Sequence, residues 1–160
     1  MSPLSRKIVA AVEARASDAG AGPVAVDDGP NRLALEVVDA HPLGVSFDAL
    51  EFASTAAAGR SPAELKAWGD RLAGRLTYLL EPLVVLEVDA VGLEVELRSA
   101  SPTARDATRS YYEARLRSDG SARLRRLAFD AADRRRHPVP CRVTLEVLER
   151  LADDLVATSA

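Results

Sequence analysis

The sequence predicts an α+β fold, a mainly antiparallel sheet of about seven or eight strands with three helices packed largely on one face. One observation is the order of the patterns: a helix, three strands, a helix, four or five strands and a helix. A parallel sheet would instead need regular strand–helix alternation. A second observation is size and composition, because 160 residues with 48% hydrophobic and 28% charged residues are typical of one globular domain. We therefore expect a single domain over residues 1–160.

Three segments carry helix signals. Residues 2–18 open with Ser-Pro, an N-cap followed by the residue favoured in a first helical turn, and then repeat an apolar residue every fourth position. In "SPAELKAWGDRLAGRLTYLL", residues 61–80, Ser61 and Glu64 form a capping box, and leucines at helical spacing extend the predicted helix to the end of the segment. Residues 144–156 form an amphipathic pattern behind a threonine N-cap, and the four residues after it are expected to fray.

The strands are predicted by alternation of apolar and polar residues, with turn chemistry between them. "DGPN" at residues 28–31 separates the first two strands. Within residues 43–53 the apolar residues change phase, so burying all of them requires a bulge near residues 48–49. Two further strands flank a turn at residues 89–92. Residues 99–110 resemble a loop and are expected to be the mobile segment.

A hairpin is predicted in "YYEARLRSDGSARLRRLAF", residues 111–129. A two-residue turn would place core and solvent residues opposite each other, whereas a three-residue loop at residues 118–120 aligns the apolar residues of the two strands. The loop glycine then takes the left-handed conformation that this loop requires. Leu127 and Phe129 fall out of phase with the earlier apolar residues, which predicts a bulge near residues 125–126.

The other face of this hairpin is rich in arginine. The three-residue loop places Arg115 opposite Arg123, and like charges directly opposite each other destabilise a sheet slightly unless the face is well solvated or an anion lies across it. We expect this face to be exposed and, where a partner exists, to be the contact surface. The candidate partner-binding residues are Arg115, Arg117, Arg123, Arg125 and Tyr111.

The net charge of −3 conceals a strong asymmetry. Residues 105–142 hold eleven arginines and five acidic residues, a balance of +6, while the rest of the chain has a balance of −9. Such a split is compatible with a merely solvated face, with an acidic protein partner, and with attraction between the two parts, within one chain or between copies. Nucleic acid is not expected, because the overall charge is negative and the arginine-bearing face offers only one aromatic residue for stacking. Residues 134–136, three consecutive arginines, are interpreted as a solvated turn.

No pattern predicts a catalytic, cofactor or metal site. His41 and His137 each precede a proline and lack a recognisable nucleophile or carboxylate constellation. Cys141, the single cysteine, is expected to be a small buried residue. With neither a signal peptide nor a membrane span predicted, we expect a cytoplasmic protein.

The favoured function is that of a non-enzymatic module that binds a protein with an acidic surface or a second copy of itself as a homodimer. The first alternative is an enzyme or small-ligand-binding domain whose site is assembled only in the fold. The third is a weak nucleic-acid binder. The sequence alone does not separate these three.

Overall fold

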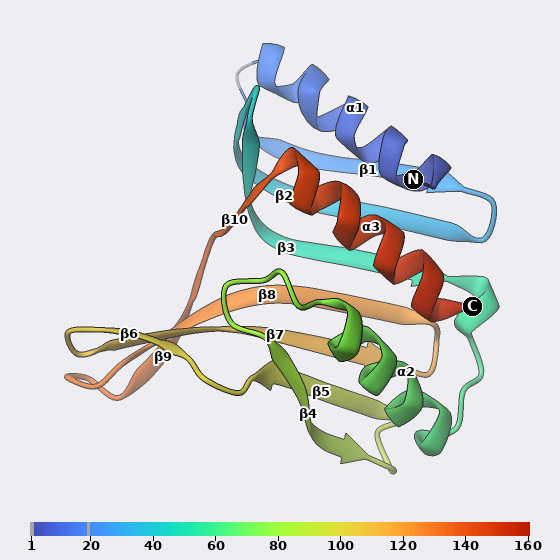
Figure 1. Ribbon diagram of the computed structural model, residues 1–160, viewed down its shortest axis with the longest axis vertical. Coiled ribbons are helices and arrows are strands. Elements are labelled where there is room, and N and C mark those ends of the chain that lie inside the picture. Colours follow the sequence, from blue (N-terminus) through green and yellow to red (C-terminus); the bar gives the residue numbers. More distant parts are fainter. Residues whose placement is uncertain (1, 19) are drawn as a thin grey trace.

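The computed structural model describes residues 2–18 and 20–160 and shows three helices and one ten-stranded antiparallel sheet (Figure 1). The helices are α1 (Pro3–Ser17), α2 (Pro62–Arg75) and α3 (Leu145–Ser159). The first strands are β1 (Gly22–Asp28), β2 (Asn31–His41), β3 (Gly44–Ser54), β4 (Leu83–Asp89) and β5 (Glu94–Ser99). The others are β6 (Thr103–Arg105), β7 (Thr108–Arg117), β8 (Ser121–Asp130), β9 (Arg135–Val139) and β10 (Cys141–Thr144). The predicted fold class is confirmed.

Seven strands form the main sheet in the order β1-β2-β3-β8-β7-β5-β4. The helices cover one face: α1 packs on β1 and β2, α2 packs on β4 and β5, and α3 lies between the other two helices (Figure 1). The core lies between these layers and includes the fully buried Trp68, Phe47 and Phe52. The opposite side of the sheet carries no helix, and we call it the open face. None of the helices in the described residues is long and apolar enough to cross a membrane.

Short-range signals in the sequence correctly predicted the caps of the helices and one bulge in the sheet. Ser2 and Thr144 cap α1 and α3, and the capping box of Ser61 and Glu64 is formed at the start of α2. The bulge near residues 48–49 is confirmed by the register of β2 on β3, which moves from Leu35–Leu50 to Val37–Phe47 and so leaves one extra residue in β3. This bulge turns both apolar phases of the strand toward the core.

The bulge predicted near residues 125–126 is wrong. β8 pairs with β7 without interruption from Ala122 to Asp130, so Leu127 faces the open side and is buried there. Arg126 instead occupies a position on the helix side of the sheet. A cation can lie there because Glu81 provides a buried carboxylate opposite it.

Two helix ends also differ from expectation. α2 ends at Arg75 rather than near residue 80, and the chain then turns so that the Tyr78 hydroxyl donates to Asp154 of α3. The predicted fraying of the last residues is wrong, since α3 continues to Ser159. Its end is held by side chains of α2 and the preceding loop: Arg71 donates to the Thr158 carbonyl at 2.9 Å.

The sheet extends beyond its main body into a smaller region that we call the wing, residues 103–110 and 126–139. Here β7 and β8 continue past their main-sheet neighbours, β6 pairs with β7, and β9 pairs with β8 (Figure 1). The mobile loop expected at residues 99–110 is therefore wrong in part, because β6 and the start of β7 form a hairpin there. A hydrogen bond from Thr103 to Glu81 ties this hairpin to the loop before β4.

Candidate protein-binding surfaces

The arginine hairpin has the predicted register. Its loop is three residues long, Gly120 has a φ of 88°, and Arg115 lies opposite Arg123 on the open face. A side chain at position 120 would also collide with the neighbouring chain, since an added Cβ would lie 2.2 Å from the Ser54 carbonyl oxygen. Glycine is therefore required both by backbone conformation and by close packing.

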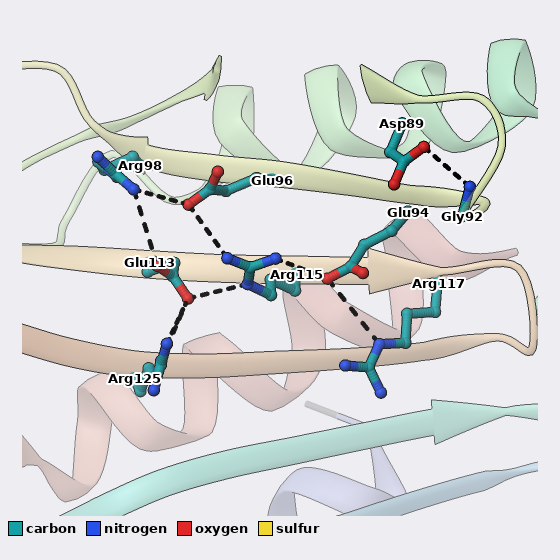
Figure 2. A network of polar contacts seen from close by, with 9 residues as sticks. All are labelled: Asp89, Gly92, Glu94, Glu96, Arg98, Glu113, Arg115, Arg117 and Arg125. Carbon is teal, nitrogen blue, oxygen red and sulfur yellow. Dashed lines mark hydrogen bonds and ion pairs between the residues drawn. The ribbon is translucent and has the colours of Figure 1, made fainter. Parts of the chain in front are cut away.

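The open-face arginines are joined to carboxylates of the same chain (Figure 2). Arg115 donates to Glu94 at 3.0 Å on β5 and to Glu113 at 3.0 Å on its own strand. Arg125, on β8, donates twice to the same oxygen of Glu113, at 3.1 and 3.0 Å. A third arginine, Arg98 on β5, donates to Glu96 of the same strand at 2.9 Å. Glu113 and its neighbours thus form a ladder of alternating charge across three strands.

Glu113 is the centre of this network. Its side chain is only 2% exposed, and burial alone would raise the pKa of its carboxyl, but the hydrogen bonds from Arg115 and Arg125 outweigh burial and the net pKa is lowered. The pKa of Arg115 is raised, because Glu94 and Glu113 hold its charged form. The like-charge contact between Arg115 and Arg123 is therefore offset by carboxylates within the chain.

The remaining candidate residues of this face also have contacts within the chain. Arg117 lies 3.9 Å from Glu94, and Arg123 lies 3.4 Å from Glu51 on β3, both in exposed surroundings. Tyr111 is on the open face but only 5% exposed, with the Arg98 guanidinium 5.2 Å from its ring centroid. A stacking base or partner would have to displace Arg98 to reach this ring. The face predicted to be basic is therefore largely neutralised by the protein itself.

On the helix side, Arg126 and Glu81 form a buried pair. Two nitrogens of Arg126 bond the two oxygens of Glu81 at 2.5 and 2.8 Å, and the side chains are 12% and 2% exposed. The guanidinium also lies 4.7 Å from the centroid of the Tyr112 ring. Burial raises the pKa of the neighbouring Cys141 thiol to about 12, so this cysteine is protonated at neutral pH. The pair is a structural anchor between β8 and the loop that precedes β4.

A broad groove of about 1000 Å³ lies above this pair. Its walls come from the loop after α2, from the wing hairpin and from β10, and they include the exposed Leu80 and Arg105. Because Arg126 and Glu81 satisfy each other at its floor, an anionic ligand would have to compete with Glu81. The groove instead places the exposed apolar side chain of Leu80 at its rim, near Arg105 of the wing.

The wing carries arginines of a different kind. Five of its arginines are exposed, and none of their guanidinium groups is within ion-pair distance of a carboxylate in the residues that the structure describes. They are Arg105, Arg109, Arg134, Arg135 and Arg136. Sequence reasoning interpreted the last three as a solvated turn; in the structure Arg134 lies in the turn with a φ of 57°, and the other two begin β9. Asp130 lies opposite Arg135, and Asp133 accepts a hydrogen bond from the Arg135 backbone amide. The run of three arginines was the signal, but the sequence alone did not reveal that their guanidinium groups form no ion pair in the described residues.

The histidines do not assemble a recognisable site. His41 is exposed and lies 2.7 Å from Asp39, while His137 is an exposed residue of β9. In residues 2–18 and 20–160, no group of three or more His, Cys, Asp and Glu side chains is arranged to hold a metal ion. A scan against protein-family models and searches of the curated proteins and the solved structures found no match to this chain.

Proposed function

We propose that the chain is a non-enzymatic protein-binding module whose wing contacts an acidic surface, on a partner protein or on a second copy of the chain. The observation that carries this proposal is the difference in pairing: the arginines of the main sheet have carboxylate neighbours, whereas the exposed arginines of the wing have none among the described residues. Exposed and unneutralised cations accelerate association with an acidic surface and give it a strong salt dependence.

The groove at the base of the wing supports a protein as the partner. Leu80 is 72% exposed and lines this groove together with Arg105 of β6. Protein contacts typically combine an apolar centre with a polar rim. A single-stranded nucleic acid would instead use exposed aromatic rings, and Tyr111 and Tyr112 are each only 5% exposed. We also propose a cytoplasmic location, supported by a single cysteine that is fully buried.

The test uses fluorescently labelled poly-L-glutamate as an acidic polypeptide, with binding measured by anisotropy at about 50 and 300 mM NaCl. Wild-type protein is expected to bind at low salt and to lose most of that binding at high salt. The double variant Arg134→Ala/Arg136→Ala is expected to bind at least tenfold more weakly. A matched control, Arg6→Ala/Lys66→Ala, removes two exposed cations from α1 and α2 and is expected to bind as wild type.

Two parallel measurements separate the alternatives. Stronger binding to a 20-base-pair duplex than to poly-L-glutamate would favour nucleic acid and contradict the proposal. Sedimentation velocity across a range of concentrations tests the second copy as partner, since self-association through the wing must weaken in the Arg134→Ala/Arg136→Ala variant. Equal binding by this variant and the control would refute the wing as the contact surface.

A further inference from the structure

The two edge strands of the main sheet differ in whether side chains hydrogen-bond to their free backbone groups. β1 and β4 are the outermost strands, and each pairs with only one neighbour in the described residues. At the β1 edge, Lys7 donates to the Asp27 carbonyl at 2.7 Å and Arg15 donates to the Pro23 carbonyl at 2.7 Å. Pro23 itself removes a main-chain donor. Helix α1 thus closes this edge against a further strand.

The β4 edge has no such closure. Among the described residues, no side chain hydrogen-bonds to the backbone of Leu83–Asp89. Apolar side chains project here instead: Val84 is 46% exposed, Leu86 54% and Val88 37%. With the following turn, this region holds five of the eight exposed large hydrophobic residues of the described chain. A free edge with exposed apolar residues is the usual docking site for an added strand.

The charges on β4 indicate what kind of strand fits. The register on β5 places Glu87 and Asp89 on the open face and Val85 and Val88 on the helix side. Both acidic residues are exposed, and Glu87 forms no ion pair in the described residues. Val84, opposite Arg98, shares the open face with the two carboxylates. An incoming strand would therefore meet mainly carboxylates on the open face and apolar side chains on the helix side. Alternating basic and apolar residues match both faces.

A second copy is a poorer occupant of this edge. An antiparallel pair of β4 strands centred near Leu86 or Glu87 would place the two copies' Glu87 side chains directly or diagonally opposite each other, which is unfavourable. The register shift between Val85 and Glu87 leaves Leu86 as an extra residue, and this bulge disfavours a regular two-fold pairing. A short flexible peptide adapts to such an edge more easily than a folded strand does.

We propose that the free edge of β4 binds an extended segment of a partner protein, with alternating basic and apolar residues, as an additional strand of the sheet. Main-chain hydrogen bonds to β4 hold the segment, Glu87 and Asp89 attract its basic residues, and Val85 and Val88 contact its apolar residues. This surface is separate from the wing, and the inference does not rest on the function proposed for the wing.

The probe is a fluorescein-labelled decapeptide of alternating valine and lysine, measured by anisotropy, with a valine–glutamate decapeptide as its charge control. We expect the lysine peptide to bind and the glutamate peptide to bind at least tenfold more weakly. Glu87→Lys is expected to weaken lysine-peptide binding at least tenfold. The matched variant Glu36→Lys, which changes an exposed carboxylate on β2, is expected to leave it unchanged. Asp89 is not substituted, because its carboxylate accepts bonds from the Val91 and Gly92 amides of the turn.

A second comparison tests whether the peptide binds as a strand. A lysine peptide N-methylated at every residue keeps its side chains but has no main-chain donors, and it is expected not to bind. Amide hydrogen exchange in β4 is expected to slow when the unmodified peptide is present. Equal binding of both peptides would reduce the contact to simple charge attraction and overturn the proposal. A stable dimer of the chain alone that buries the β4 amides would also overturn it, because the edge would then belong to a second copy.

Discussion

The arginines on the open face of the main sheet form ion pairs with carboxylates, whereas the five exposed arginines of the wing form none in the described residues, although strands β7 and β8 run through both regions. In the main sheet the neighbours of these strands are β5, which carries Glu94 and Glu96, and β3, which carries Glu51. In the wing the neighbours are β6 and β9, which carry arginines themselves. The surroundings that each strand acquires in the sheet therefore decide whether an arginine is paired with a carboxylate of the same chain or forms no ion pair in the described residues.

This difference explains the charge asymmetry of the sequence. A balance of +6 in residues 105–142 against −9 elsewhere is partly an attraction within the chain, because acidic residues of β3, β5 and the loop before β4 reach the arginines of β7 and β8. The exposed arginines of the wing have no such ion pair in the described residues.

The largest effect is expected where the wing joins the main sheet. Arg126→Met leaves the Glu81 carboxylate buried without its cation, and we expect a loss of about 3–5 kcal/mol in the free energy of unfolding, measured with urea. Replacing both residues, Arg126→Met/Glu81→Met, removes the buried charges together and should restore most of that loss. A double variant as unstable as the single one would show that the pair is not an isolated charge couple.

A smaller loss is expected at the centre of the open-face network. Glu113→Gln keeps the shape of the side chain but removes the charge that Arg115 and Arg125 share. We expect a loss of about 1.5–3 kcal/mol in unfolding free energy, the range for hydrogen bonds to charged groups. Glu87→Gln changes an exposed carboxylate that forms no ion pair in the described residues; it is the control and should change stability by less than about 0.5 kcal/mol. Equal effects of the two substitutions would contradict the central role of Glu113.

Glu113 is also expected to make the unfolding free energy depend on pH. The pKa of Glu113 is lower in the folded protein than the value of about 4.3 in an unfolded chain, so its contribution is complete above that unfolded value and is lost as pH falls through the folded pKa. The difference in unfolding free energy between wild type and Glu113→Gln should therefore be largest near pH 7 and shrink in acid. A difference that stays constant down to about pH 3 would mean that the carboxylate does not act through its charge.

The smallest effect is expected at the edge of the network. Arg123→Glu relieves the like-charge contact with Arg115 but loses the exposed ion pair with Glu51 and places two carboxylates together. These opposing contributions are each a fraction of about 1 kcal/mol, so the net change in unfolding free energy should stay within about 1 kcal/mol. Loss of folding in this variant would place Arg123 in a buried arrangement and contradict its observed exposure.

Much of the fold followed from local chemistry in the sequence. The three-residue loop at residues 118–120, the bulge in β3 and the caps of the helices depend on neighbours within a few residues, and the structure confirms each of them. The errors arose where distant residues decide the outcome. The bulge near residues 125–126 was predicted because nothing near Arg126 in the sequence showed that Glu81, 45 residues earlier, lets it lie on the helix side. The final residues of α3 were expected to fray because Arg71, which holds them, is distant in sequence.

The candidate binding surface was also predicted only in part, because its ion pairs depend on residues distant in the sequence. The sequence placed the main-sheet arginines on the open face correctly, but two of their acidic partners, Glu94 and Glu51, lie on β5 and β3, and strand order cannot be read from alternation. For the same reason, the arginines at residues 134–136 gave no sign that their guanidinium groups would form no ion pair in the described residues. Whether an arginine is paired is a property of the sheet rather than of its own strand.

The most direct test measures stability and binding together in two matched double variants. Arg134→Ala/Arg136→Ala removes two wing arginines, and Arg115→Ala/Arg125→Ala removes two that bond Glu113. The account predicts that the wing variant keeps its unfolding free energy within about 0.5 kcal/mol and loses at least tenfold in poly-L-glutamate affinity. The network variant should lose about 2–4 kcal/mol of stability, because Glu113 stays buried with its two main donors gone, and should keep its affinity. The opposite assignment, with binding lost in a stable network variant and retained in the wing variant, would contradict the central claim.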